Sequence, residues 1–226
     1  MNLSPLYISL KVSLIATVFT FFLGIAAARW VVKLKRGKAF VDGVFTLPMI
    51  LPPTVAGFFL LLLFGKNSLI GQFLGLFDIS IVFTWAAAVI ASSVVSFPLM
   101  YRTVRGALEE IDSDMVYAAR TLGVSENRIF RKIIIPNIIP SIIAGTILAF
   151  ARALGEFGAT IMIAGNIPGK TQTMAVAVYT AVQAGNYNLA YQWVGIITVM
   201  SFAAMFLMNY INQYYMKKNH KRGDIG

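Results

Sequence analysis

Arg152 and Glu156 are the most chemically distinctive pair in the sequence, because they are charged residues inside a long apolar segment. They lie four residues apart, and in a helix this spacing places both side chains on one face, where they can form an ion pair. Ionisable groups in apolar segments usually face the interior of a helix bundle or a pathway. Two interpretations stay open: a structural brace between helices, or an arginine that attracts an anion while the glutamate holds it in place.

Other catalytic chemistry finds little support in the sequence. There is no cysteine, which excludes a disulfide framework, a thiol nucleophile and a Cys-based metal site. The one histidine, His220, belongs to a basic tail. The run Gly165–Thr171 is similar to a phosphate-binding loop, but three residues separate its glycines where that loop needs four. We therefore expect a chain that is not an enzyme and that binds no metal and no cofactor.

The composition is typical of a membrane protein. Of the 226 residues, 58% are hydrophobic and 12% are charged, and the mean hydropathy is +0.75. Soluble domains, in contrast, are about 25% charged. The net charge is +10, and fifteen of the 19 Lys and Arg residues fall in the stretches 29–38, 102–132 and 217–222. Because these stretches alternate with nearly uncharged segments, the charge indicates membrane topology and not nucleic-acid binding.

Five uncharged segments approach the length of about 20 apolar residues that a bilayer-spanning helix needs. They are residues 12–28, 43–65, 79–101, 133–151 and 193–210. The fourth helix is expected to continue through Arg152 and Glu156. The shorter stretch 172–182 predicts a re-entrant or surface helix on the outer side. The fold class is thus all-α and polytopic, with the N-terminus outside and the basic C-terminus in the cytoplasm.

The stretch Tyr117–Pro136 lies in the basic segment between the third and fourth predicted spans. Helix-capping serines precede two short periodic stretches, and Gly123 between them suits a left-handed turn, so the pattern predicts a helix, a turn and a second helix. Ala118 and Ala119 leave a shallow surface that another protein can approach, and Arg120 can contact an acidic partner. An ordinary solvated hairpin between two spans is the alternative interpretation.

This stretch resembles the cytoplasmic coupling loop of ABC importer permeases, whose pattern is Glu-Ala-Ala, three residues, Gly, nine residues, Ile-x-Leu-Pro. Five residues match at the right spacing, namely Ala118, Ala119, Gly123, Ile133 and Pro136. Tyr117 replaces the glutamate and cannot supply its charge, and Ile135 replaces the leucine. The resemblance implies that a loop of about residues 102–137 docks onto an ATPase. It assigns the coupling to Tyr117, Ala118, Ala119, Arg120, Gly123, Ile133 and Pro136.

Two further segments resemble the molybdate and tungstate branch of these permeases and, more loosely, sulfate permeases. They are Phe150–Thr160 with the following run to Thr171, and Pro48–Gly57. The resemblance covers most of the chain and implies a type I ABC importer permease, one transmembrane domain over residues 1–226, in a bacterial or archaeal inner membrane. It also implies a homodimer in contact with lipid, ATPase subunits that use the ATP, and an extracellular or periplasmic oxyanion-binding protein.

Three alternatives stay open. A sulfate or thiosulfate permease would have the same architecture and differ in the oxyanion that stimulates ATP hydrolysis. A channel or ion-coupled carrier would transport without an ATPase, and the loop pattern would then be accidental. An intramembrane enzyme would have Arg152 and Glu156 as its polar residues, but no second polar cluster accompanies them in the apolar segments.

Overall fold

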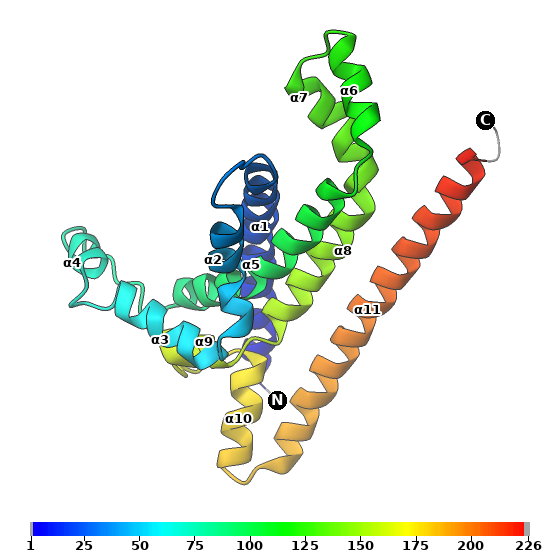
Figure 1. The fold of residues 1–226 in the computed structure, drawn as a ribbon. Coiled ribbons are helices and arrows are strands. Elements are labelled where there is room, and N and C mark those ends of the chain that lie inside the picture. The colour runs from blue at the N-terminus through cyan, green and yellow to red at the C-terminus, as the bar shows by residue number, and fades with distance from the viewer. Residues whose placement is uncertain (1, 224–226) are drawn as a thin grey trace.

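The computed structural model describes residues 2–223, except the side chains of Asn212 and residues 214–223, so the side chain of His220 lies outside the described residues. All regular secondary structure in the described chain is helical, with no strand, which confirms the all-α prediction. In chain order the elements are α1 Ser4–Val32, α2 Lys38–Ile50, α3 Pro53–Phe64, α4 Leu69–Gly75, α5 Trp85–Glu109, α6 Ser113–Thr121, α7 Glu126–Ile129, the π-helical turn η1 Phe130–Ile134, α8 Ile135–Leu154, α9 Gly158–Ala164, α10 Met174–Gln183 and α11 Tyr187–Gly223 (Figure 1).

Four helical stretches are long and apolar enough to cross a membrane, and they are α1, α5, the continuous stretch Glu126–Leu154 and α11. A fifth span arises if α2 and α3 are taken together, although these two helices are bent by 111° relative to each other. The described residues thus provide four or five spans, which agrees with the predicted number of about five.

One part of the bundle is built around α5, which packs against both α1 and α8. Met100 of α5 is fully buried between two glycines, Gly24 of α1 and Gly145 of α8. A Cβ added to Gly24 would lie 2.7 Å from the Met100 Cγ, and one added to Gly145 would lie 2.9 Å from its sulfur. Glycines therefore let three helices approach closely, as is common where helices pack inside membranes.

The second predicted span, residues 43–65, is broken into two helices. Pro48 lies inside α2, and the chain is extended at Leu51 and Pro52 before α3 begins at Pro53. Proline lacks the amide hydrogen that would continue the helix, and its ring clashes with the preceding turn. The prolines thus account for the break, and the two helices meet at a bend of 111°.

The prediction that the fourth helix continues through Glu156 is wrong, because α8 ends at Leu154 and α9 starts only at Gly158. The shorter helix α9 packs against α3, the second half of the other broken span. A Cβ on Gly57 of α3 would lie only 2.7 Å from the Cα of Ala159, and one on Gly158 would lie 3.0 Å from the Pro53 Cβ. Two half-helices therefore form a closely packed pair.

The helices α10 and α11 form a hairpin at the end of the bundle that holds the start of α1 (Figure 1). The short helix predicted at 172–182 is confirmed as α10, and Gly185 takes a left-handed turn (φ 70°) before α11. The buried hydroxyl oxygen of Ser9 in α1 accepts a hydrogen bond of 2.8 Å from the backbone N–H of Met174. This bond fixes the first turn of α10 to α1.

Candidate functional site

The polar loop between α5 and α8 folds as a helical hairpin, as its sequence pattern predicts. Asp112 caps α6 by accepting a hydrogen bond of 2.8 Å from the backbone N–H of Asp114. Gly123 ends the hairpin turn with φ of 73°, and the N–H of Val124 donates to the Ala119 carbonyl. Because this backbone conformation is strained for residues with a Cβ, glycine is the residue suited to the turn. The hairpin continues through α7 and η1 directly into α8.

The exposed surface of α6 differs from the one that the sequence suggested. Ala118 and Tyr117 are exposed, but Ala119 is only 7% exposed because it faces the interior of the hairpin. Leu122, in contrast, is 82% exposed at the end of α6. The accessible apolar surface therefore includes Tyr117, Ala118 and Leu122, and Met115 is 39% exposed on the same helix. The predicted docking residues do not include Leu122, because the family pattern marks Ala118, Ala119 and Gly123 and leaves the residue before the glycine unspecified.

Arg120 lies across the hairpin turn from Glu126. Its Nε is 2.6 Å from Glu126 Oε1 and its Nη2 is 3.2 Å from Oε2, so the pair is bidentate. The hydrogen bonds to the carboxylate raise the pKa of Arg120, which stays charged. In this structure the predicted contact residue therefore stabilises its own hairpin. The two remaining predicted residues lie further along the chain, where Ile133 is half-buried in η1 and Pro136 is exposed in the first turn of α8.

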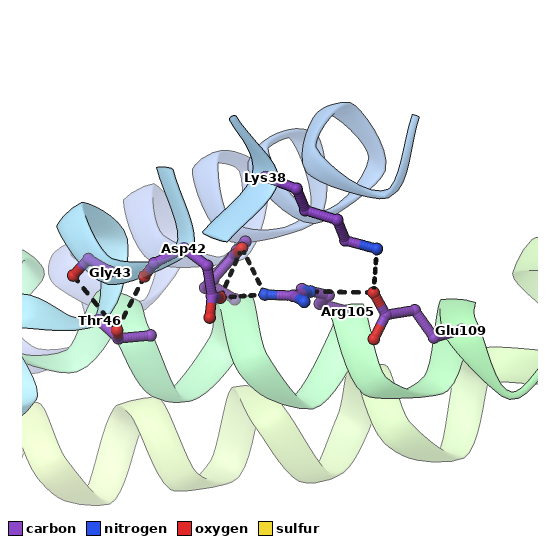
Figure 2. A network of polar contacts seen from close by, with 7 residues as sticks. Lys38, Asp42, Gly43, Thr46, Arg105 and Glu109 are labelled. Carbon is purple, nitrogen blue, oxygen red and sulfur yellow. Dashed lines mark hydrogen bonds and ion pairs between the residues drawn. The ribbon is translucent and has the colours of Figure 1, made fainter. Parts of the chain in front are cut away.

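A polar network joins α2 to the end of α5, immediately before the hairpin (Figure 2). Arg105 pairs with Asp42 of α2, and its Nε donates to Glu109 Oε1 at 3.1 Å. Lys38 of α2 lies 2.6 Å from the same Glu109 oxygen. The Tyr101 hydroxyl donates to Asp42 at 3.0 Å. Sequence reasoning missed this network, because residues about 60 positions apart give no local signal.

Arg152 and Glu156 form an ion pair of 2.6 Å between Arg152 Nη1 and Glu156 Oε2. The second carboxylate oxygen, Oε1, accepts a hydrogen bond of 2.8 Å from the backbone N–H of Ala159. This second contact caps the first turn of α9, where backbone N–H groups have no helical partner. The glutamate is 1% exposed, and 33% of the Arg152 side chain stays exposed.

The segment Gly165–Thr171, which is similar to a phosphate-binding loop, is a turn that closes on itself. The Thr171 hydroxyl accepts a hydrogen bond of 3.0 Å from the Ile167 N–H and lies 3.4 Å from the Gly165 carbonyl oxygen. No strand precedes this turn in the described chain, and it leads into α10. It therefore lacks the strand–loop–helix context of a nucleotide-binding loop.

The broken spans, the α6–α7 hairpin and the short helix α10 together resemble the architecture of ABC importer permeases. The fold is similar to that of a methionine ABC transporter in an inward-facing conformation, with a TM-score of 0.72 and 16% identity over 93% of this chain and 94% of that one. It is also similar to a bacterial alginate ABC transporter in complex with an alginate-bound periplasmic protein, with a TM-score of 0.74 and 15% identity over 95% and 79% of the two chains.

The family described as binding-protein-dependent transport system inner membrane component matches residues 20–218, and the chain belongs to this family. A Bacillus subtilis (strain 168) protein assigned to molybdenum transport as a permease is 45% identical over 96% of this chain and 94% of its own length. The molybdenum transport system permease protein of Escherichia coli (strain K12) is 48% identical over 78% of each chain. A sulfate transport system permease protein of Salmonella typhimurium (strain LT2) is 35% identical over 93% of this chain and 76% of its own.

Proposed function

We propose that this chain is the membrane-spanning permease subunit of an ATP-driven importer for molybdate or tungstate. The observation that carries this proposal is its identity of 45% and 48% to two permeases of molybdenum transport, against 35% to a sulfate permease. In the proposal the chain forms the translocation path, an external binding protein delivers the oxyanion, and separate ATPase subunits bind and hydrolyse the ATP. The chain itself holds no cofactor.

The α6–α7 hairpin is the part that docks onto the ATPase. Tyr117, Ala118 and Leu122 offer the exposed apolar surface, while Ala119 and Gly123 set the shape of the turn. The neutral Tyr117 replaces a family glutamate, so this contact relies on apolar packing and not on an acidic side chain at that point. Ile133 and Pro136 then direct η1 and α8 from the docked hairpin into the membrane.

Both termini are assigned to sides of the membrane by the basic residues. The hairpin and the last turns of α11 lie at one end of the molecule, and the start of α1 and the α10–α11 turn lie at the other (Figure 1). The basic stretches 29–38 and 102–132 belong to the first end. Since basic loops stay in the cytoplasm, the N-terminus lies outside and the C-terminus inside.

Two copies of the chain form the path. Four or five spans per chain are few for a gated route that must accept a hydrated dianion. A homodimer doubles this number and brings two hairpins to the cytoplasmic face, one for each ATPase subunit. The broken spans α2–α3 and α8–α9 are the natural moving parts, because broken helices in membranes occur where they line a cavity.

Arg152 supplies positive potential to the anion route, and Glu156 holds it in place. Glu156 is buried and uses both oxygens, one for Arg152 and one for the first turn of α9. The exposed part of the pair is the arginine, whose guanidinium has five N–H donors and engages only some of them here. This arrangement favours a role of Arg152 in the anion pathway over a purely structural ion pair, in which both side chains would be buried.

Reconstitution tests the proposed function directly. The permease, its ATPase and its binding protein are placed in proteoliposomes, and ATP hydrolysis and uptake are measured with molybdate or sulfate. We expect molybdate to stimulate both. Stimulation by sulfate alone would favour the alternative represented by the Salmonella typhimurium sulfate permease. Uptake that continues without the ATPase would instead identify a channel or carrier.

A further inference from the structure

The α6–α7 hairpin has few neighbours of its own in the described structure. In backbone packing α6 contacts α7 and α7 contacts η1, and the hairpin is attached to the bundle at two places: the end of α5, and the segment of α7 and η1 that leads into α8. We call these two attachment points the first and second root of the hairpin. Because a force applied to the hairpin must pass through the roots, the side chains that hold them determine which helices move with it.

The first root is held by α2. Glu109 is the last residue of α5, and the cap of α6, Asp112, follows three residues later. Lys38 and Asp42 of α2 reach Glu109 and Arg105 respectively, so two ion pairs with partly buried side chains tie α2 to the last turns of α5 (Figure 2). Pairs linked in this way act as a network, which is stronger than an isolated surface ion pair.

The second root is held by α1. Arg29, in the last turn of α1, donates from Nη2 to the Asn127 side-chain oxygen at 3.1 Å. Its guanidinium also lies over the ring of Phe130, 3.9 Å from the centroid. Phe130 is the first residue of the π-helical turn η1, and such turns often occur at functional sites. A planar guanidinium can stack and donate at once, whereas a lysine ammonium cannot do both equally well.

Both roots are therefore held by one hairpin of the chain, since α1 and α2 are joined by the turn at residues 33–37. We infer that the α1–α2 hairpin is a brace that makes α1, α2 and the α6–α7 hairpin move together, with Arg29 and Arg105 as its positioning residues. This inference rests on the proposed function. It predicts that α2, and with it the α2–α3 bend, moves when ATP binding displaces α6 and α7.

The first test needs the permease alone and no transport assay. Backbone amide hydrogen exchange is measured in lipid nanodiscs for Arg29→Ala and Arg105→Ala. Matched controls are Arg36→Ala, in the exposed α1–α2 turn, and Arg102→Ala, exposed on α5. Each control removes one positive charge near the same root. We expect amides at residues 113–135 to exchange roughly tenfold faster in the two test variants, the effect of losing a charge-assisted hydrogen bond. Equal exchange in test and control variants would overturn the brace.

The second test measures molybdate transported per ATP hydrolysed by the complete transporter in proteoliposomes. Arg29→Ala and Arg105→Ala should lower this ratio roughly three- to tenfold, the size expected for a change in coupling between sites. Their ATPase rates should persist, and both controls should match the wild type. Phe130→Leu removes the ring and keeps an apolar side chain, and it should lower the transport ratio as Arg29→Ala does. Arg29→Lys should give a ratio between those of Arg29→Ala and the wild type.

The outcomes separate the inference from the proposed function. If the wild type shows no ATP-dependent uptake, the proposed function fails, and the exchange measurement still decides whether the brace exists. If the wild type is fully active and the test variants keep the wild-type ratio of transport to hydrolysis, the brace does not carry coupling and the inference is wrong.

Discussion

Glu156 is buried to 1% exposure, while its partner Arg152, 2.6 Å away, keeps a third of its side chain exposed. The two members of the pair therefore have different tasks. The glutamate neutralises part of the arginine charge and caps α9 through the Ala159 amide, and the arginine is the member that another group can reach. This asymmetry leads to the first two predictions.

Glu156→Gln should destabilise the protein. The glutamine oxygen can still accept from Ala159, but the charge that balances Arg152 is lost at membrane depth. Removing one partner of a fully buried ion pair costs about 3 kcal/mol or more, because the other charge is left uncompensated, and a smaller loss is expected here because a third of the Arg152 side chain is exposed. Thermal unfolding in detergent measures the loss. An unchanged unfolding temperature would show that Arg152 is solvated by water or lipid and does not depend on Glu156.

Arg152→Lys and Arg152→Met distinguish a role of Arg152 in the anion pathway from a purely structural role in its ion pair with Glu156. If Arg152 attracts the anion, the lysine variant keeps the charge and should retain most transport, while the methionine variant should lose roughly tenfold or more of the uptake rate. The uptake rate in proteoliposomes at low molybdate concentration is the measurement. Equal rates in both variants, with equal amounts of folded protein, would favour the structural brace.

Gly123→Ala should weaken the hairpin turn through backbone conformation alone. Nothing lies within 4 Å of an added Cβ, so no clash accompanies the change. A left-handed conformation costs a residue with a Cβ about 1–2 kcal/mol. Gly123→Pro should be worse, because proline cannot adopt φ of 73° and loses the N–H that donates to Arg120. We expect ATP hydrolysis uncoupled from uptake in the proline variant, and normal coupled uptake there would contradict a docking role.

Gly57→Ala should disturb the packing of α3 on α9. The added Cβ would meet the Ala159 backbone at 2.7 Å, so the two half-helices must separate, at a cost of about 1–3 kcal/mol. Gly43→Ala in α2 is the matched control, since its Cβ meets nothing within 4 Å. Alanine there should stabilise the helix by about 0.5–1 kcal/mol. Gly57→Ala should therefore unfold at a lower temperature than the wild type and than Gly43→Ala, and an unfolding temperature of Gly57→Ala equal to or above that of the wild type would refute close packing at Gly57.

The sequence predicts the parts of this fold that depend on local patterns. The length of the apolar segments predicts the spanning helices, the shorter apolar run 172–182 predicts α10, and Gly123 predicts the turn of the hairpin. These features arise from residues close together in the chain, so hydropathy and turn preferences suffice to find them.

The sequence does not predict the features that depend on distant contacts. Pro48, Pro52 and Pro53 indicate an interrupted helix, but they predict neither the 111° bend between α2 and α3 nor the packing of α3 on α9. The break before α9 is stabilised by Glu156, which accepts from the Ala159 amide in place of a continued helix. The contact of Arg29 with Asn127 joins residues 98 positions apart, and no periodicity reports such a pair.

Burial also decides where a probe for docking should be placed. Ala119 belongs to the family pattern, but it is buried inside the hairpin, whereas Ala118 is exposed beside Tyr117. A pattern of small residues shows where a surface can be flat, and it does not show which of two neighbours faces outward. A reporter group should therefore be placed at Ala118.

Docking of the α6–α7 hairpin onto an ATPase is tested most directly by a cysteine cross-link. The chain has no cysteine, so Ala118→Cys introduces a single thiol, to be paired with one cysteine in the docking groove of the co-expressed ATPase. We predict a cross-link whose yield changes when ATP binds, and no cross-link from Ala119→Cys, which stays buried. Absence of any cross-link from Ala118→Cys, with both proteins folded and present in the membrane, would contradict the docking and favour a channel or carrier that works without an ATPase.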